Sequence, residues 1–207
     1  MVKAIVNYYT ENTYIINEQA NAFIIDPGAH VEEIKAYIDE ANLEVKGILL
    51  THGHFDHLFS INEVHDLYQC PVYIFASERD FLFDANLNLS STITKPITFK
   101  KKAMIQTLSD NDTLTLGRET IRVIHTPGHT RGGVCYQYKR FLFSGDTLFK
   151  GTIGRTDLPT ASRVDMERSL KRIVSVTKDN TVVYPGHGPF TTILNEKYDN
   201  PYLANLR

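Results

Sequence analysis

The sequence is poor in cysteine and has no long apolar run. Cys70 and Cys135 are far apart and form no Cys-x-x-Cys pair, so we expect two buried structural thiols rather than a disulfide framework. No apolar stretch reaches the roughly eighteen residues that cross a bilayer. The chain turns polar by Asn7, too early for the core of a signal peptide. A cytoplasmic protein with no membrane partner is expected.

Basic residues are not in excess either. The formal net charge is -2 and the pI is about 6.4, which gives no electrostatic footprint for a nucleic-acid backbone or an anionic membrane. Hydrophobic residues make up 42% of the chain and charged residues 22%, as in an ordinary globular protein with a sizeable core. Without a linker, repeat or low-complexity tract, residues 1–207 are predicted to form a single domain.

The first half of the chain alternates short apolar runs with an amphipathic stretch. Residues 31–41 place Val31, Ile34, Ile38 and Ala41 on one helical face. A second helix is expected to end near Gln69. Strands are expected at 14–16, 22–25, 47–50 and 71–75, and a turn at 26–28. Residues 84–104 follow no regular pattern, and we interpret them as a surface excursion that could cover a site.

The second half predicts strands joined by tight turns. Gly117 and the pair Lys139-Arg140 mark hairpins. Ser162 is a candidate N-cap for a helix to about Ser175. The expected strands are 113–116, 120–125, 133–138, 141–144 and 181–184, and a short helix follows from Thr191 to Asn200. Alternating strand and helix groups in both halves predict an α/β fold with helices outside the sheet.

One motif is hard to explain without metal. His52-x-His54-x-Asp56-His57 directly follows the apolar run 47–50. Imidazole nitrogen and carboxylate oxygen bind zinc and other first-row divalent ions. The spacing of His52 and His54 lets two imidazoles converge from an extended loop, while Asp56 and His57 can point toward a second ion.

Further candidate ligands share one context, since each follows an apolar strand in a glycine-containing turn. His129 follows 121–128, Asp146 follows 141–145, and His187 follows 181–186. Polar groups that tight turns hold at one edge of a sheet can form a site on a rigid scaffold.

Together these motifs resemble the metallo-β-lactamase superfamily, and Gly145-Asp146-Thr147-Leu148-Phe149 with Pro185-Gly186-His187-Gly188-Pro189 resembles its short glyoxalase II-like (hydroxyacylglutathione hydrolase-like) members. The resemblance implies an αββα sandwich: two mixed β-sheets packed together, with helices on both outer faces. It also implies a metal-dependent hydrolase of small thioesters. No separate C-terminal helical substrate domain is expected, because only a short stretch follows His187.

The resemblance also implies a ligand set for two divalent metal ions. His52, His54 and His129 would hold the first ion, and Asp56, His57 and His187 the second. Asp146 would bridge them, and Asp56 and Asp146 are the candidate catalytic carboxylates. Zinc is the expected metal, with iron and manganese as alternatives. Two such ions activate a water molecule as hydroxide, which would attack the thioester carbonyl.

Arg155, in Gly154-Arg155-Thr156-Asp157, is the candidate substrate-binding residue, since the resemblance places it where full-length glyoxalase II has a lysine that contacts the thiol carrier. Asp157 stands where that family has a tyrosine, which leaves the carrier open. Arg131 replaces a common proline and could alter the charge at the mouth of the site. The expected partner is a small-molecule thioester, and the protein a monomer or small homo-oligomer.

Three alternatives remain open. A mononuclear iron persulfide dioxygenase of the same fold would use His52, His129 and Asp146, although such enzymes usually carry cysteine where this chain has Ile153. A nuclease of the superfamily is disfavoured by the acidic charge balance. A purely structural metal module is disfavoured because closed structural sites are rich in thiolate.

Some residues keep two interpretations. Asp26 either caps the turn at 26–28 or orients a ligand histidine. The three aromatic residues Phe55, Phe59 and Phe149 either line a pocket or pack in the core. His30, His65 and His125 are expected to be structural or to lie on the surface.

Overall fold

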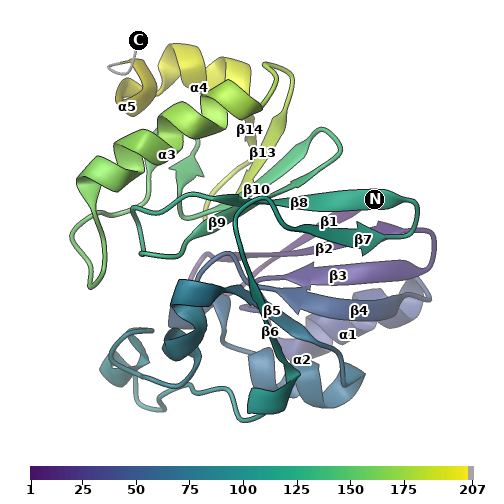
Figure 1. Cartoon of the computed structure of the whole chain (residues 1–207). Helices are drawn as coiled ribbons and strands as arrows, with labels where there is room; N and C mark the ends of the chain where they lie inside the picture. Colours follow the sequence, from purple (N-terminus) through teal and green to yellow (C-terminus); the bar gives the residue numbers. More distant parts are fainter. Residues whose placement is uncertain (205–207) are drawn as a thin grey trace.

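Two six-stranded β-sheets lie face to face in residues 1–204, the part of the chain that the computed structural model describes (Figure 1). The first sheet has the order β1-β2-β3-β4-β5-β6. β1 to β3 pair antiparallel, and β3 to β6 pair parallel. Its strands are β1 (Val2–Val6), β2 (Asn12–Glu18), β3 (Asn21–Ile25), β4 (Glu44–Leu49), β5 (Val72–Phe75) and β6 (Ile105–Leu108).

The second sheet has the order β14-β13-β10-β9-β8-β7 and is mixed as well, since only β10 and β13 run parallel. Its strands are β7 (Thr113–Leu116), β8 (Glu119–His125), β9 (Val134–Tyr138), β10 (Phe141–Gly145), β13 (Val182–Pro185) and β14 (Thr191–Thr192). A separate small hairpin pairs β11 (Leu148–Phe149) with β12 (Thr152–Ile153).

Side-chain alternation along the strands builds the central core. In β2, Ile15 faces the helices outside the first sheet, whereas Tyr14 and Ile16 face the second sheet. The inward residues meet Tyr136 and Phe143 of the second sheet, and all of these side chains are buried. Burial of each such side chain contributes about 1.5–3 kcal/mol, so the contact between the sheets is a main source of stability.

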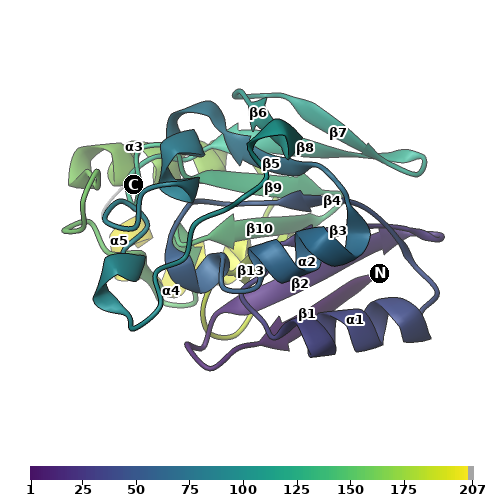
Figure 2. The same cartoon turned by 90° about the horizontal axis from the view of Figure 1, so that it is seen from below.

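Helices cover both outer faces (Figures 1 and 2). α1 (Val31–Glu40) and α2 (Ile61–Tyr68) pack on the first sheet, and α3 (Arg163–Val176), α4 (Ile193–Asp199) and α5 (Pro201–Ala204) lie outside the second. The hydroxyl of Ser162 accepts a hydrogen bond from the amide of Asp165, as its predicted N-cap role requires. The expected αββα sandwich is confirmed. No helix in residues 1–204 is long and apolar enough to cross a membrane.

Several elements were not expected from the sequence. β1 and β6 are edge strands of the first sheet, and their half-exposed residues lack a long apolar signature. Short 3-10 helices also occur at Phe55–His57, Ala76–Leu82, Ser90–Thr92 and Lys102–Met104. They are too short to show a hydrophobic period, which is why pattern reasoning does not find them.

Residues 84–104 are irregular, as expected, but they are not only a surface excursion. Asn88, Ser90 and Phe99 are buried. The Asn88 side chain donates to two backbone carbonyls, and the backbone carbonyl of Asn88 accepts the amide of Phe55 at 2.9 Å. The segment therefore packs against the loop that carries the histidine motif. Cys70 and Cys135 are both buried free thiols, as predicted.

The topology brings four strand ends to one rim of the sandwich. β4 leads into His52, β8 into His129, β10 into Asp146 and β13 into His187. Backbone hydrogen bonds connect these ends across the sheets: the Val134 amide donates to the Thr51 carbonyl at 2.8 Å, and the Gly186 amide to the Gly145 carbonyl at 2.8 Å. The candidate ligands are thereby fixed on main chain that is part of the fold.

Candidate metal centre

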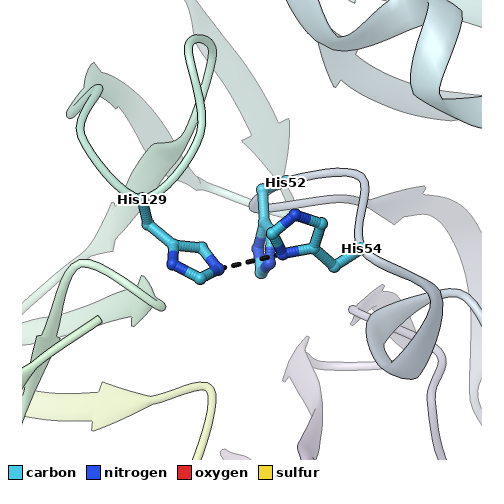
Figure 3. A group of neighbouring side chains, drawn as sticks. All are labelled: His52, His54 and His129. Carbon is cyan, nitrogen blue, oxygen red and sulfur yellow. Dashed lines mark hydrogen bonds between the residues drawn. The ribbon is translucent and has the colours of Figure 1, made fainter. Parts of the chain in front are cut away.

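Three buried histidines form the first part of the centre (Figure 3). His52 and His54 come from the loop after β4, and His129 comes from the loop after β8. His54 Nδ1 lies 2.9 Å from His129 Nε2, and the His52 ring centroid is within 4.9 Å of both other rings. The imidazoles converge on one point, as ligands of a single ion must.

A second group joins the short 3-10 helix Phe55–His57, which forms the end of the motif, to the turn after β13. Its members are Asp56, His57 and His187, which offer ligand atoms within 4.8 Å of one another. His187 Nε2 lies 3.2 Å from an Asp56 oxygen. Asn12 of β2 donates to the carbonyls of Pro185 and Gly188 and so anchors the turn that carries His187.

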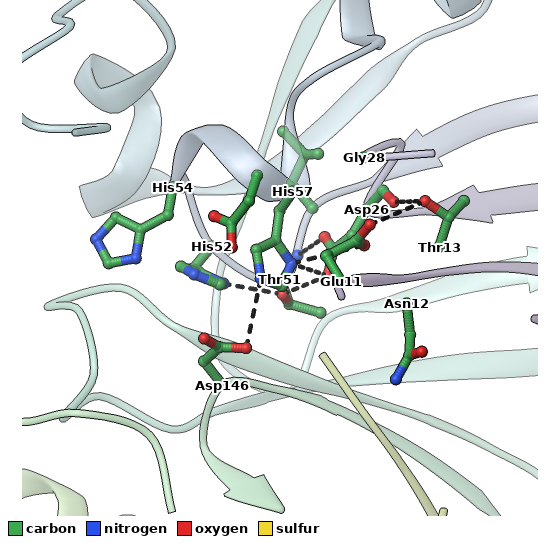
Figure 4. A network of polar contacts seen from close by, with 12 residues as sticks. Glu11, Asn12, Thr13, Asp26, Gly28, Thr51, His52, His54, His57 and Asp146 are labelled. Atoms are coloured by element: carbon green, nitrogen blue, oxygen red, sulfur yellow. Dashed lines mark hydrogen bonds and ion pairs between the residues drawn. The ribbon is translucent and has the colours of Figure 1, made fainter. Parts of the chain in front are cut away.

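Asp146 lies beside His57, and a dashed line joins the two side chains in Figure 4. One carboxylate oxygen is 3.5 Å from His129 Nε2 and 3.7 Å from His187 Nε2, and the other is 3.4 Å from His57 Nε2. It therefore reaches members of both groups, which is the placement that a bridging ligand requires.

Neighbouring acceptors orient the imidazoles. His57 Nδ1 donates to Asp26 Oδ2 at 3.0 Å, and His129 Nδ1 donates to the Arg155 carbonyl at 2.9 Å. Each bond places the ring proton on Nδ1 and directs the Nε2 lone pair inward. Of the two interpretations of Asp26, the contact with His57 supports the orienting one.

The pKa values of the carboxyl groups are set by competition between burial and positive charge. Burial raises the pKa of Asp146, but His57, His129 and His52 outweigh it and hold that pKa well below the ordinary value. The pKa of Asp56 is likewise lowered, because His57 and His187 outweigh its burial. Both side chains are thus ionised at neutral pH, as metal ligands must be.

The pKa values of the histidines diverge. Burial, followed by neighbouring His57 and His54, depresses the pKa of His52 well below the ordinary value. Burial, followed by the neighbouring His129, lowers the pKa of His54 to about 3. Burial also disfavours the charged form of His57, but Asp146, Asp56 and Asp26 outweigh it and raise its pKa well above the ordinary value. His52 and His54 are therefore neutral donors. The three carboxylates around His57, by contrast, favour positive charge at that position.

Unsatisfied polar atoms test whether metal fits this arrangement. Nε2 of His52, His54 and His57 and Oδ1 of Asp146 are buried without a hydrogen-bond partner among the described residues. Buried polar atoms are nearly always paired, so four in one cluster need a common partner. A divalent cation meets this need, because its ligands are nitrogen and carboxylate lone pairs. The donor set fits metal.

Close backbone approach explains the glycines of the centre. In the turn at 26–28 the positive φ belongs to Asp26, at 50°, and not to Gly28. At Gly28, a Cβ atom would stand 2.0 Å from the Asp56 carbonyl oxygen and 2.2 Å from a Glu11 side-chain oxygen. Gly28 is required for space rather than for backbone freedom.

Two buried carboxyl groups near the centre, Glu11 and Glu78, were not predicted from the sequence. Glu11 Oε1 lies 3.9 Å from His57 Nδ1, and burial raises the pKa of Glu11 well above the ordinary value. Glu78, in the 3-10 helix Ala76–Leu82, accepts backbone amides from both histidine loops. Neither residue belongs to a recognisable motif. The one local signal for Glu11 is its position between a turn and the start of β2 at Asn12.

Both candidate arginines have an aspartate partner. The guanidinium of Arg131 pairs with Asp80 and donates to the Ser77 carbonyl. The guanidinium of Arg155 pairs with Asp157 at the surface, 2.9 Å away. Arg155 also lines a cavity of about 440 Å³ with Ile153, Arg163, Tyr202 and other residues.

The aromatic residues near the motif are partly exposed. Phe149 meets the His187 ring edge-on at 6.1 Å, and Phe59 lines a cavity of about 290 Å³ with Tyr8, Tyr9 and His30. Phe55 contacts Tyr9 edge-on at 5.2 Å. Phe59 thus lines a cavity, and Phe55, Phe59 and Phe149 all lie outside the buried core. His65 is buried against the Cys70 carbonyl and His125 stacks on Phe75, so both are structural, as expected.

Comparison with known proteins agrees with this geometry. A family model described as the metallo-beta-lactamase superfamily matches residues 7–187. An uncharacterised protein of Mycobacterium leprae is 40% identical, over 94% of each chain. A probable metallo-hydrolase of Bacillus subtilis, YqgX, is 36% identical over 93% of this chain and 92% of its own. The hydroxyacylglutathione hydrolase GloC of Haemophilus influenzae is 31% identical over 96% and 95%.

Solved structures share the fold over nearly the whole chain. The B3 metallo-beta-lactamase BLEG-1 superposes with a TM-score of 0.90 at 40% identity and covers 98% of this chain and 99% of its own. TTHA1623, solved in a di-iron-bound form, gives a TM-score of 0.86 at 32% identity, with 98% and 100% covered. ETHE1 from Myxococcus xanthus gives 0.80 at 25%, with 99% and 85% covered.

Proposed function

This chain belongs to the metallo-beta-lactamase superfamily, and we propose that it is a metal-dependent hydrolase of small thioesters. The observation that carries the proposal is the shared position of Asp146, within 3.7 Å of histidines from both ligand groups. We assign His52, His54 and His129 to one ion, Asp56, His57 and His187 to the other, and Asp146 to both. When bound, two divalent ions lower the pKa of water and polarise a carbonyl group.

The protein side chains supply position and charge. Asp26 and the Arg155 carbonyl fix the ring orientation of His57 and His129, so the donor atoms need no rearrangement. Asp56 and Asp146 are the catalytic carboxylates of the proposal, because both are ionised and both lie among the candidate metal ligands. We propose zinc as the metal, although the di-iron form of TTHA1623 makes iron the alternative to test.

The leaving group favours thioesters. A thiolate leaves with a pKa near 8.5 and so needs little protonation, whereas an amide nitrogen must be protonated as it leaves. The ionisable groups around the centre are ligand candidates or already accept hydrogen bonds: Asp26 from Thr51, Glu78 from two amides, and Glu11 from Asn7 and Thr13. We therefore assign no side chain as a general acid. The similarity to GloC, a hydroxyacylglutathione hydrolase, supports the same substrate class.

We propose that Arg155 recognises the thiol carrier. Its exposed guanidinium lines a cavity of about 440 Å³. The backbone carbonyl of the same residue orients His129. A carboxylate on the carrier would compete with Asp157 for this group. We further propose that residues 1–207 act as a single domain, as a monomer or small homo-oligomer in the cytoplasm.

A second candidate is β-lactam hydrolysis, which is favoured by the 40% identity to the B3 metallo-beta-lactamase BLEG-1. The deciding experiment measures kcat/KM for one acyl group as thioester, oxygen ester and amide, together with a β-lactam and a persulfide, on the metal-loaded protein. The proposal expects the thioester to be preferred over the ester and the amide. Comparable rates on the amide or the β-lactam would overturn it, and oxygen consumption with persulfide would replace it with the dioxygenase.

A further inference from the structure

We propose that Glu78 is a positioning residue that holds the His52/His54 loop against the His129 loop and so sets the spacing of the three-histidine group. This inference rests on the metal-binding part of the proposed function. Glu78 belongs to no motif of the sequence, it is fully buried, and it accepts hydrogen bonds from backbone amides.

The two carboxylate oxygens of Glu78 divide between the loops. Oε2 accepts the amide of Gly53 at 3.0 Å, and Oε1 accepts the amide of Gly132 at 2.8 Å. Gly53 stands between His52 and His54, and Gly132 follows His129 by three positions. A single side chain therefore bridges main chain that carries all three histidines.

The surrounding glycines show how closely the Glu78 segment approaches. A Cβ atom on Gly53 would stand 2.3 Å from Phe81 Cβ, and one on Gly132 would stand 2.6 Å from Glu78 Cγ. Both loops thus lie directly on the 3-10 helix Ala76–Leu82. Arg131 reinforces the contact, because its guanidinium donates to the Ser77 carbonyl and pairs with Asp80.

A second link between the loops lies at Thr51, where the His52/His54 loop leaves β4. There the Val134 amide donates to the Thr51 carbonyl at 2.8 Å. The Glu78 bridge joins the loops at Gly53, between the two motif histidines, and at Gly132. Without it, this carboxylate link is lost, and the relative positions of His54 and His129 are less constrained.

The test measures metal affinity in Glu78→Ala, Glu78→Gln and wild type by equilibrium dialysis against a graded series of chelator, with elemental analysis of the retained metal. Partners that orient ligands from outside the coordination sphere typically change metal affinity by 10- to 100-fold. We expect a loss of about this size in Glu78→Ala for one of the two ions, with the other ion retained. Glu78→Gln, which keeps one acceptor oxygen, should lie between the alanine variant and wild type.

Glu196→Ala is the matched control. Glu196 is also a buried carboxyl group that accepts a backbone amide, from Gly151 at 2.8 Å, together with the Thr191 hydroxyl. It should lower the melting temperature without a selective loss of one ion. Should Glu78→Ala fail to fold, Gly132→Ala displaces the same segment while the carboxylate remains, and it should also weaken one ion.

The outcomes separate the two proposals. If wild type binds no metal, the proposed function fails. If wild type binds two ions and the Glu78 and Gly132 variants keep both with unchanged affinity, only the positioning role fails. A parallel weakening of both ions in Glu78→Ala and Glu196→Ala would also overturn it, because it would show general destabilisation.

Discussion

Asp26 and Thr51 are joined by two hydrogen bonds: the amide of Thr51 donates to Asp26 Oδ1 at 2.7 Å and its hydroxyl to Oδ2 at 2.6 Å. The same Oδ2 accepts the Nδ1 proton of His57 at 3.0 Å. The end of β3 thus holds both ends of the histidine motif. The arrangement makes Asp26 rigid and aims His57 at the space that it shares with Asp146.

Asp26→Asn should therefore weaken metal binding rather than remove a ligand. The amide keeps the shape but can present an N–H to His57, which favours the wrong tautomer. Loss of such an outer partner costs about 10- to 100-fold in metal affinity. Titration with a competing chelator measures the effect, and Thr51→Val, which keeps the carboxylate, should be milder. Equal losses in both variants would argue against the orienting role.

Metal stoichiometry gives a direct check on the ligand assignment. The purified protein should bind about two first-row divalent ions per chain at neutral pH, since the group of His52, His54 and His129 and the group of Asp56, His57 and His187 can each hold one. Because metal binds the folded state, free metal at a hundred times its Kd should stabilise the fold by about 2.7 kcal/mol. Elemental analysis and thermal melts with and without chelator measure both. A fixed content of one iron would favour the dioxygenase.

Asp146→Asn should lose far more activity than Arg155→Ala. The asparagine variant removes a charge that faces both ligand groups, and a loss of about 2.7 kcal/mol in transition-state stabilisation corresponds to roughly 100-fold in kcat/KM. Arg155 is exposed and paired with Asp157, so its loss should cost only a few-fold. Steady-state kinetics on one thioester compares them. The bridging role is wrong if Asp146→Asn retains most of wild-type kcat/KM.

Arg155 should determine which carrier is preferred. Thioesters of one acyl group on a carboxylate-bearing thiol should be better substrates than those on an uncharged thiol, because the guanidinium can pair with the carboxylate. The preference should shrink in Arg155→Ala, mainly through KM. Added salt should reduce it too, since the group is exposed. A preference that is unchanged in the variant would remove Arg155 from substrate binding without affecting the thioesterase proposal.

Titration of Glu78 should make the free energy of unfolding depend on pH. Burial raises its pKa to about 7, from an ordinary value of 4.5, although two amides, Thr130 and the nearby Arg131 oppose the shift. The folded state therefore holds a proton between these values that the unfolded state has lost, so the free energy of unfolding falls as pH rises from about 4.5 to about 7. The difference of about 2.5 units corresponds to at most about 3 kcal/mol.

Urea denaturation of the metal-free protein at several pH values measures this slope. Glu78→Gln cannot ionise, so its stability relative to wild type should improve by up to about 3 kcal/mol across the window. The histidines titrate in both proteins, and their contribution cancels in the comparison. Parallel pH profiles for the two proteins would show that Glu78 does not titrate there.

Local sequence determined the motif and most of the elements that carry it. His52, His54, Asp56 and His57 lie within one short loop, so their convergence follows from spacing alone. His129, Asp146 and His187 each follow an apolar strand that ends in a glycine turn, a local pattern that predicts a place at a sheet edge. The hairpin at Lys139 and the Ser162 cap were predicted for the same reason.

Only the tertiary structure decided how these residues are grouped and what supports them. Asp146 meets both groups because parallel pairing of β10 with β13 brings it beside His187. Glu78 accepts hydrogen bonds from the backbone amides of Gly53 and Gly132. Every non-proline residue has such an amide, so no residue pattern marks the partners of Glu78. Long-range contacts to main chain leave no trace in local sequence, whereas periodicity and turn chemistry do. That difference separates what could be read from the sequence from what required the fold.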